Sequence, residues 1–186
     1  MARLYLVRHA KAAARFDEDP DPSLSEEGKD AAIELALEME SLGPMPIYTS
    51  PMERARETAL PLANRWGMVP EVSAAFTEIP TPNDIAEKGL AARGPWLQQI
   101  AAQKYPAQPP IIRAWREGLI GMLKSCRSDT IVFTHFMVIN AAMGAALNDE
   151  RVVVMQPDYC SCTIVETSSR GIALISRGTE AQTKVL

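Results

Sequence analysis

The 186-residue chain contains only two histidines, three cysteines and 6% aromatic residues, and it has no long hydrophobic run. Because a helix needs about 20 mostly apolar residues to cross a bilayer, no part of the sequence predicts a membrane span. Only four apolar residues separate Arg3 from Arg8 at the amino terminus, too few for a secretory signal peptide. We therefore expect a cytoplasmic protein.

Basic residues are fewer than acidic residues in this chain. The chain has 19 Lys and Arg against 23 Asp and Glu, which gives a net charge of -4. Nucleic-acid binders grip the phosphate backbone through basic surfaces, so this charge argues against a general nucleic-acid partner. A small phosphorylated substrate is not excluded, because it needs only a local cluster of arginines. The sequence leaves the oligomeric state open.

The cysteines and histidines do not form a recognisable metal or redox pattern. Cys126, Cys160 and Cys162 have neither a zinc nor a CxxC spacing. In a strand, Cys160 and Cys162 would lie on one face and could not bridge easily, so free thiols in a reducing compartment are the simplest interpretation. Because no H-x-x-x-H or nearby carboxylate spacing accompanies the two histidines, we expect no metal and no cofactor.

Short apolar runs alternate with amphipathic segments along most of the chain. The predicted strands are Leu4–Val7, Ile47–Thr49, Ile131–Thr134, Val152–Val154, Cys160–Val165 and Ile172–Ile175. The predicted helices run from Ser25 to about Leu42, from Ser50 to about Trp66, from Ile111 to Lys124, and from His135 through Ala146. This order predicts an α/β fold in which residues 1–186 form one domain, a three-layer α/β/α sandwich with a mostly parallel central sheet.

The pattern weakens between Phe76 and Pro110. This segment holds six prolines and two glycines, with helical fragments near Asp84–Arg93 and Pro95–Gln103. We interpret residues 76–110 as an insertion over the strand ends, that is, a lid that sets substrate specificity. Trp96 and Arg93 are possible substrate contacts there, although core packing and solvent exposure are the commoner explanations for such residues.

Both histidines follow predicted buried strands. Arg8 and His9 come directly after Leu4–Val7, and His135 comes directly after Ile131–Thr134. In open α/β sheets, ligands bind at the carboxyl ends of the strands, so these side chains are expected to meet at one site. Ser50 is the predicted N-cap of the second helix, and Arg54 lies in the first turn of that helix.

This set of side chains suits a phosphoryl group. Guanidinium groups clamp phosphate through paired hydrogen bonds, and a helix amino terminus adds free amide donors. An imidazole in such a place can attack phosphorus and form a phosphohistidine that water later resolves. The leaving alcohol would then need a proton from a general acid, most simply a carboxylate.

Four ordered segments carry a family resemblance: L-Y-L-V-R-H-A at residues 4–10, T-S-P-M-E-R-A-R-E-T-A at 49–59, F-T-E-I at 76–79 and V-F-T-H-F at 132–136. Together they resemble the motifs of the histidine phosphatase superfamily, also called the phosphoglycerate-mutase-like fold. The R-H pair and the S-P-x-x-R-A-x-x-T-A segment are specific in combination, whereas the other two are weak alone. The resemblance extends over roughly residues 4–140.

The resemblance implies a role for each matching residue. His9 would be the nucleophile that becomes phosphorylated. Arg8, Arg54 and His135 would hold the phosphoryl group and stabilise charge in its transition state, as positioning and electrostatics do in phosphoryl transfer generally. Glu78 would be the proton donor to the leaving group.

Some residues depart from the family pattern. Alanine stands at Ala10 where relatives usually carry glycine, and Arg15 stands where the mutase branch has asparagine, so Arg15 would present another cation to an anionic substrate. The residues after Glu78 also differ from that branch, which leaves Asp84 and Glu87 as alternative proton donors. Phe136-Met137 replace the glycines that often follow the second histidine, and they would form an apolar wall beside the phosphate.

The leading functional hypothesis is a phosphatase that hydrolyses a small phosphomonoester through His9 without a metal. The short chain leaves little room for the insertions that mutases use to contact substrate, so a hydrolase is favoured over a phosphoglycerate mutase-type phosphotransferase. A phosphohistidine phosphatase acting on a signalling protein is a related alternative, since small family members of that kind tend to lack the acid. A non-catalytic module that binds phosphorylated ligands is the alternative from a different class.

Overall fold

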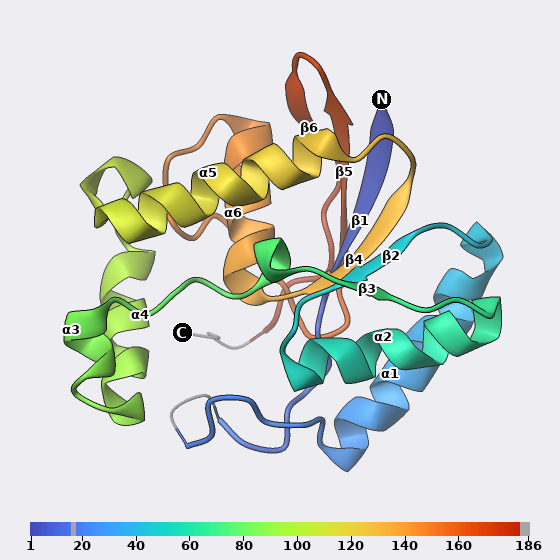
Figure 1. Cartoon of the computed structure of the whole chain (residues 1–186), viewed down its shortest axis with the longest axis horizontal. Helices are drawn as coiled ribbons and strands as arrows, with labels where there is room; N and C mark the ends of the chain where they lie inside the picture. Colours follow the sequence, from blue (N-terminus) through green and yellow to red (C-terminus); the bar gives the residue numbers. More distant parts are fainter. Residues whose placement is uncertain (16–17, 183–186) are drawn as a thin grey trace.

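Strand β1 (Ala2–Arg8) lies inside a six-stranded sheet with the order β3-β2-β4-β1-β5-β6 (Figure 1). The computed structural model describes residues 1–15 and 18–182. The other strands are β2 (Ile47–Thr49), β3 (Glu71–Val72), β4 (Thr130–Thr134), β5 (Cys162–Ser168) and β6 (Gly171–Ser176). Strands β1 to β4 are parallel, whereas β5 and β6 run antiparallel to their neighbours. The sheet is therefore mostly parallel, as the sequence predicts.

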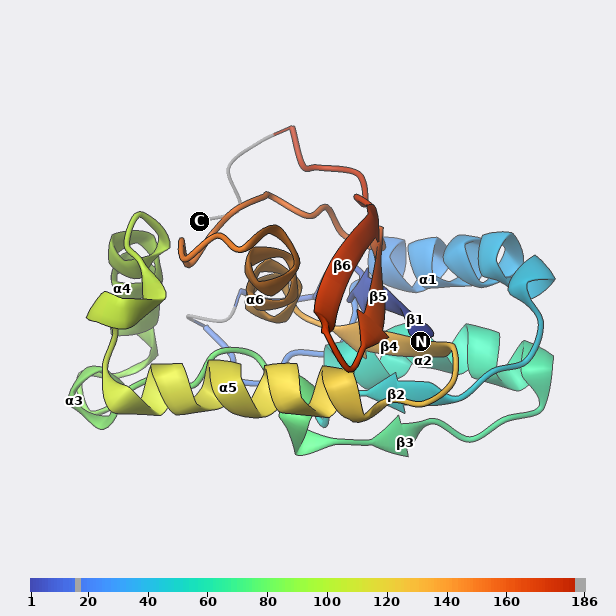
Figure 2. The ribbon, with the colours of Figure 1, turned by 90° about the horizontal axis from the view of Figure 1, so that it is seen from above.

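Helices cover both faces of this sheet, which makes three layers (Figure 2). On one face lie α1 (Glu26–Met39) and α2 (Glu53–Trp66), and on the other lie α5 (Pro110–Ser125) and α6 (Phe136–Leu147). Two shorter helices, α3 (Asn83–Ala86) and α4 (Arg93–Ala101), lie at the outer side of α5 and α6. Single 3-10 turns occupy Glu40–Leu42, Ala74–Phe76, Leu90–Ala92 and Tyr105–Ala107.

The alternation of side chains along β1 explains how one strand serves two hydrophobic cores. Successive strand residues point to opposite faces of a sheet. Leu4 and Leu6 pack with residues of α5 and α6, whereas Tyr5 and Val7 pack with residues of α1 and α2. A strand buried on both faces carries a continuous apolar run, which is the pattern of this strand.

One predicted strand is absent. Val152–Val154 has no sheet partner in the described ranges, although Val152 is fully buried. The Asn140 side-chain oxygen accepts hydrogen bonds from the amides of Val154 (2.7 Å) and Met155 (2.9 Å). An asparagine of α6 therefore satisfies backbone groups that a neighbouring strand would otherwise satisfy, so the prediction of a strand was wrong.

The predicted start of α2 was also wrong, by about two residues. The helix begins at Glu53 with Met52 at the N-cap position, and the Ser50 hydroxyl does not cap it at the expected place. Instead, the Asp21 carboxylate accepts a hydrogen bond from the Glu53 amide at 2.8 Å. The loop between β1 and α1 thus supplies the cap, and Arg54 still lies in the first turn of α2.

The segment from residue 76 to residue 110 is built on short helices. The fragment predicted near Asp84–Arg93 is interrupted, because Gly89 has a φ of 88° and separates α3 from the 3-10 turn that follows. The second predicted fragment is α4, whose buried Trp96, Leu97 and Ile100 join the core on the α5–α6 face. This segment is therefore anchored to the rest of the molecule by apolar packing, and Trp96 is a core residue.

Gly28, in the first turn of α1, is required for a close approach to the β1–α1 loop. A β-carbon at this position would lie well inside contact distance of the Lys11 carbonyl oxygen, which also accepts hydrogen bonds from Ser25. We expect Gly28→Ala to lower the free energy of unfolding by about 1–3 kcal/mol, because backbone atoms must move to make room. Urea denaturation followed by circular dichroism measures this change.

Gly121 in the exposed part of α5 provides the matched control. Apart from the neighbouring backbone of its own helix, no atom lies within 4 Å of where its β-carbon would be. Gly121→Ala should therefore raise the free energy of unfolding by about 0.5–1 kcal/mol, as alanine favours a helix interior. Equal effects of the two substitutions would contradict the close approach at Lys11.

No helix in the described part of the chain is both long and apolar enough to cross a membrane.

Candidate active site

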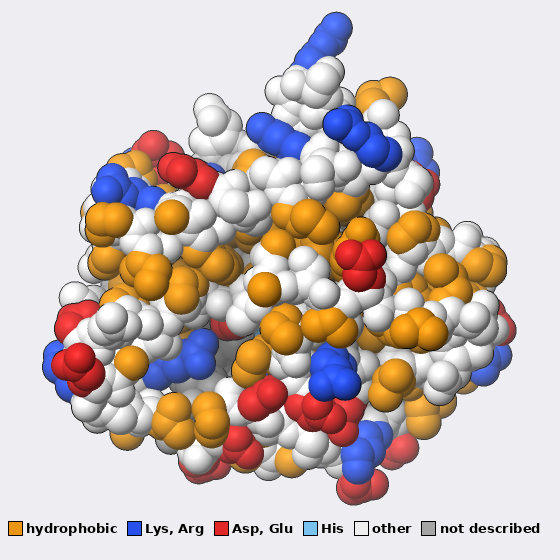
Figure 3. All heavy atoms as spheres, in the orientation of Figure 1, with side chains coloured by type: hydrophobic (Ala, Val, Ile, Leu, Met, Phe, Trp, Pro, Cys, Tyr) orange, Lys and Arg blue, Asp and Glu red, His pale blue; other side chains and the backbone are white. Residues whose placement is uncertain are grey.

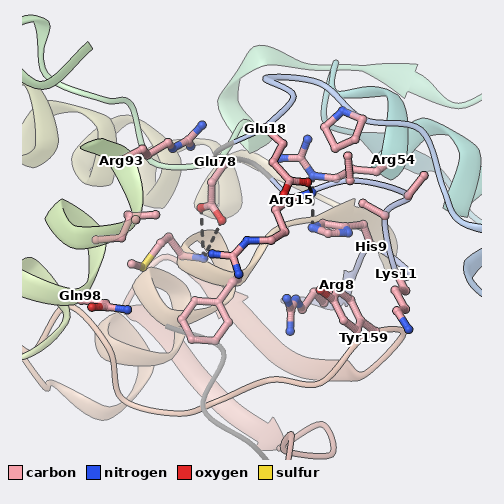
Figure 4. Close-up of a pocket in the computed structure, with 18 residues that line it drawn as sticks. Arg8, His9, Lys11, Arg15, Glu18, Arg54, Glu78, Arg93, Gln98 and Tyr159 are labelled. Carbon is pink, nitrogen blue, oxygen red and sulfur yellow. Dashed lines mark hydrogen bonds between the residues drawn. The ribbon is translucent and has the colours of Figure 1, made fainter. Parts of the chain in front are cut away.

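A cavity of about 700 Å³ opens at the carboxyl ends of the parallel strands (Figure 4). Strand β1 ends in Arg8 and leads into His9, α2 contributes Arg54, and the segment after the Ala74–Phe76 turn contributes Glu78. Arg15, from the β1–α1 loop, also lines this cavity. Five of the six site residues predicted from the sequence therefore share one cavity, and His135 lies next to it.

The His9 imidazole is held with one defined nitrogen available. Its Nδ1 lies 2.7 Å from the carbonyl oxygen of Ala10. Because a carbonyl oxygen only accepts hydrogen bonds, Nδ1 must carry the proton and Nε2 must carry the lone pair. Arg54 Nε donates a hydrogen bond to this Nε2 at 3.3 Å. The nitrogen that faces the arginine is thus the nucleophilic one.

The surroundings of His9 keep the ring neutral. Burial lowers its pKa well below the usual value of a histidine, and the positive charges of Arg54 and Arg8 lower it further. An imidazole must be unprotonated to attack phosphorus. The same two cations that would attract a phosphoryl group therefore also keep its acceptor in the reactive form.

The two arginines are buried and fixed by different partners. Arg8 is 4% exposed, and its Nη1 donates a hydrogen bond to the Pro157 carbonyl oxygen at 2.8 Å. Arg54 is 6% exposed, and its Nη1 lies 3.5 Å from an Asp21 carboxylate oxygen. Buried guanidinium groups need a counter-charge or hydrogen bonds, which an oxyanion in the cavity would supply.

His135 occupies the N-cap position of α6 and is fully buried. Its ring contacts that of His9 edge-on, with 5.2 Å between ring centroids, and its Nε2 lies 2.7 Å from the Ser50 hydroxyl. Its Nδ1 has no hydrogen-bond partner among the described residues. Burial and the neighbouring His9 lower its pKa well below the usual value. His135 is thus a neutral ring that supports His9, and its contact with the phosphoryl group remains a prediction.

The Ser50–His135 hydrogen bond accounts for the failed capping prediction at Ser50. Ser50 is fully buried, and its hydroxyl also accepts a hydrogen bond from the Met52 amide at 3.3 Å. We expect Ser50→Ala to leave both His135 nitrogens without a partner and to lower the free energy of unfolding by about 1–3 kcal/mol. Thermal and urea denaturation measure this loss. A variant as stable as the parent chain would show that the Ser50 hydroxyl does not contribute to the free energy of unfolding.

Glu78 is a partly buried carboxylate at the amino terminus of α6. Its Oε1 accepts hydrogen bonds from the amides of Ile79 (2.9 Å) and Met137 (3.1 Å). Burial raises its pKa, while these two amides and the charges of Arg93 and Arg54 oppose the rise. Burial is the largest of these effects, so the carboxyl retains a proton to higher pH than an exposed glutamate does. This is the property that a general acid needs.

The two alternative acids lie elsewhere. Asp84 and Glu87 belong to the exposed surface around α3, and neither is among the described residues that line the cavity. Arg93, in contrast, lines the wall opposite His9 together with Gln98, and both come from α4 (Figure 4). Of the residues considered between 76 and 110, Arg93 is therefore at the site, whereas Trp96 is in the core.

Sequence reasoning missed Tyr159, which lines the cavity beside Arg8. It also missed Asp21, which contacts both the α2 amino terminus and Arg54. Asp21 belongs to an acidic, proline-containing run that is typical of a loop, and Tyr159 follows an irregular segment, so neither carried a local signal. The three cysteines are free, as predicted, and the described residues contain no group of three or more His, Cys, Asp or Glu placed to hold a metal ion.

The surface around the cavity combines apolar and charged side chains. In the space-filling view, Lys and Arg side chains lie at a hollow near α3 and α4, and acidic side chains gather below it (Figure 3). The cavity itself is lined by five basic residues, Arg8, Lys11, Arg15, Arg54 and Arg93, against two acidic ones, Glu18 and Glu78. A chain with a net negative charge thus has a positive cavity, which suits an anionic ligand.

Comparison with known proteins connects this geometry to a family. A sequence model of the histidine phosphatase superfamily (branch 1) matches residues 4–179. A 5''-phosphoribostamycin phosphatase from Niallia circulans is 42% identical over 79 residues, which is 38% of this chain and 37% of that protein. The match thus spans less than half of the length of that curated relative.

Solved structures agree in overall shape. A mycobacterial glucosyl-3-phosphoglycerate phosphatase in complex with inorganic phosphate has a TM-score of 0.73 and 20% identity, over 99% of this chain and 100% of that chain. A protein from Thermus thermophilus has a TM-score of 0.62 and 21% identity, over 95% of this chain and 99% of that chain. At this level of identity the likeness shows the fold, and it confirms the predicted fold class.

Proposed function

Because the chain belongs to branch 1 of the histidine phosphatase superfamily, we propose that it hydrolyses a phosphomonoester through a phosphohistidine at His9. The observation that carries this proposal is the state of the His9 ring. Its Nδ1 is committed to the Ala10 carbonyl oxygen and its Nε2 lone pair faces Arg54 in the cavity. A neutral imidazole in this tautomer attacks phosphorus through Nε2 once Arg54 shifts its hydrogen bond from Nε2 to the phosphoryl group.

In the first step, His9 Nε2 attacks the phosphorus atom as the bond from phosphorus to the ester oxygen breaks. Arg8 and Arg54 hold the phosphoryl oxygens and balance the charge that spreads over them. Glu78, in its protonated form, gives its proton to the departing alcohol oxygen. The products of this step are the free alcohol, a phosphorylated His9 and a Glu78 carboxylate.

In the second step, water attacks the phosphohistidine. The Glu78 carboxylate takes a proton from this water as the new phosphorus–oxygen bond forms and the nitrogen–phosphorus bond breaks. Inorganic phosphate leaves, and both His9 and Glu78 return to their starting forms. The two hydrogen bonds from Ile79 and Met137 favour the carboxylate form that this second step requires.

The position of Glu78 favours an ester of an alcohol over a phosphohistidine protein as substrate. An alkoxide is a poor leaving group and needs a proton, so a carboxylic acid in the cavity is useful for ester hydrolysis. Transfer to a second alcohol, as in a mutase, would use the same first step. Release of inorganic phosphate in water distinguishes hydrolysis from such a transfer.

The substrate is proposed to be a small phosphorylated molecule. The relatives named above carry the names of phosphatases for phosphoribostamycin and glucosyl-3-phosphoglycerate. The segment 76–110 supplies one wall of the cavity through α4, which supports its role as the part that selects the substrate. Arg15 and Arg93 would face the portion of the substrate beyond the phosphate. We place the reaction in the cytoplasm, where free thiols remain reduced.

Three measurements on the purified protein test this function. A panel of phosphorylated sugars, alcohols and aryl phosphates should release inorganic phosphate without added metal. Acid-labile, base-stable phosphate should be trapped on His9 by rapid quenching and peptide mass spectrometry. Vanadate should inhibit competitively, since it would occupy the phosphoryl site between Arg8 and Arg54. Binding of phosphorylated ligands without any turnover would favour the non-catalytic module instead.

A further inference from the structure

The Arg8 guanidinium is held by an aromatic ring as well as by a hydrogen bond. Its central carbon lies 4.0 Å from the centroid of the Tyr159 ring and 5.4 Å from that of Phe136. The hydrogen bond from Nη1 to the Pro157 carbonyl oxygen fixes only one corner of the group. Arg8 Nε is buried and has no hydrogen-bond partner among the described residues. The aromatic contact therefore has a large share in setting the plane of the guanidinium.

The turn that carries Tyr159 is fastened to the end of β1. The Cys160 amide donates to the Arg8 carbonyl oxygen, and the Arg8 amide donates to the Ser161 carbonyl oxygen, each at 3.1 Å. Cys160 adopts a φ of 57°, which is uncommon for a residue with a side chain. These two hydrogen bonds fix the backbone of residues 160–161 to the backbone of Arg8, the arginine that the Tyr159 ring covers.

Tyr159 is also close to the reacting centre. Its ring centroid lies 5.8 Å from that of His9, it lines the cavity, and 42% of its surface is exposed (Figure 4). An exposed aromatic ring over a buried cation is an arrangement that stabilises the charge without closing the cavity.

We propose that Tyr159 is a positioning residue for phosphoryl binding, which holds the Arg8 guanidinium in the orientation that meets the phosphoryl oxygens. This inference rests on the proposed function for the identity of the ligand, an oxyanion between Arg8 and Arg54. It assigns Tyr159 no contact of its own with the reacting atoms. Its effect on binding passes through Arg8.

The test compares Tyr159→Leu with Tyr159→Phe, using vanadate affinity as the readout. Leucine keeps apolar bulk but removes the ring face, so we expect vanadate to bind about 10-fold more weakly. Phenylalanine keeps the ring and should stay within about 2-fold of the parent chain. The loss in Tyr159→Leu should appear in KM and not in the pH dependence of kcat. Thermal unfolding checks that both variants fold as the parent does.

A double-mutant cycle decides whether the effect passes through Arg8. In an Arg8→Ala background, Tyr159→Leu should cause no further loss of vanadate affinity. A further loss of about 10-fold in that background would overturn the inference, because Tyr159 would then act on the ligand directly. Equal affinity of Tyr159→Leu and the parent chain would overturn it as well.

Failure of this inference is separable from failure of the proposed function. Vanadate binding is measured by calorimetry and does not require turnover. Suppose that the protein binds vanadate, that Tyr159→Leu weakens this binding only when Arg8 is present, and that no phosphohistidine forms. The role of Tyr159 would then stand, and the phosphatase assignment would be wrong. A chain that forms phosphohistidine with no effect of Tyr159→Leu would retain the phosphatase assignment alone.

Discussion

Replacing His9 with alanine should abolish phosphoenzyme formation and lower kcat by more than about 10⁴-fold, since removal of a nucleophile leaves only binding and charge stabilisation. The variant loses the Nε2 lone pair that faces Arg54, and the neighbouring His135 ring lies outside the cavity lining with its Nε2 bonded to Ser50. Rapid-quench trapping of phosphate on the protein and steady-state release of phosphate measure the two effects.

The control for His9→Ala is ligand binding without reaction. Arg8 and Arg54 remain, so vanadate or phosphate should still bind to the variant. Circular dichroism and thermal unfolding should show a folded protein. Turnover at the rate of the parent chain would remove the phosphohistidine mechanism, whatever else the cavity binds.

Replacing Glu78 with glutamine should slow hydrolysis of alkyl phosphates by about 10²–10⁴-fold, the usual contribution of a general acid. The glutamine side-chain oxygen can still accept hydrogen bonds from the Ile79 and Met137 amides, so the geometry of the site is preserved. Formation of the phosphohistidine from 4-nitrophenyl phosphate should slow far less, because that leaving group departs without a proton. The dependence of the rate on the pKa of the leaving alcohol should thus become steeper.

Glu87→Gln and Asp84→Asn are the matched controls for Glu78. Both carboxylates are exposed and lie outside the cavity lining that the structure describes, so their removal should leave all rates unchanged. A large loss of alkyl phosphatase activity in either control would move the general acid to that residue. An equal loss for alkyl and aryl substrates in the rate of phosphohistidine formation in Glu78→Gln would show that Glu78 does not protonate the leaving group.

The raised pKa of Glu78 and the lowered pKa of His9 together predict how kcat/KM depends on pH. Burial raises the pKa of Glu78, and this acid must be protonated, so kcat/KM for alkyl phosphates should fall as pH rises through that raised pKa. Burial lowers the pKa of His9, so the neutral ring persists at pH values below the usual histidine range. The alkaline fall should weaken in Glu78→Gln, whereas any fall caused by the substrate phosphate should remain in both proteins.

Local patterns predicted the elements whose partners are local. Ser25 caps α1 as expected, because its hydroxyl accepts a hydrogen bond from the Gly28 amide three residues later. The continuous apolar run before Arg8 predicted a strand buried on both faces. Val152–Val154 looked similar, but a distant asparagine satisfies its backbone. An apolar run predicts that a segment is buried, but it does not predict which group accepts hydrogen bonds from the backbone amides of that segment.

The residues of the candidate site also fall into two groups, those that a local motif predicted and those that only the folded structure reveals. His9, Arg54 and Glu78 belong to motifs with an order and spacing that the sequence displays, and the structure places them in one cavity. Ser50 looked like a cap, but its hydroxyl is used by His135, which lies 85 positions further along the chain. Tyr159 and Asp21 act through contacts that only the folded chain creates, so no local pattern could have predicted them.

The order in which the strands are synthesised determines how early the active site can form during translation. Strand β1 emerges first, yet its neighbours β4 and β5 begin at Thr130 and Cys162. At about 5–20 residues per second, the nascent β1 would wait on the order of 10 seconds or longer before both partners leave the exit tunnel. During that interval its apolar edges are an aggregation hazard that chaperones would have to cover. Nascent chains that end before Tyr159 should therefore neither fold fully nor bind vanadate. Vanadate binding by ribosome-bound chains of defined length would test this expectation.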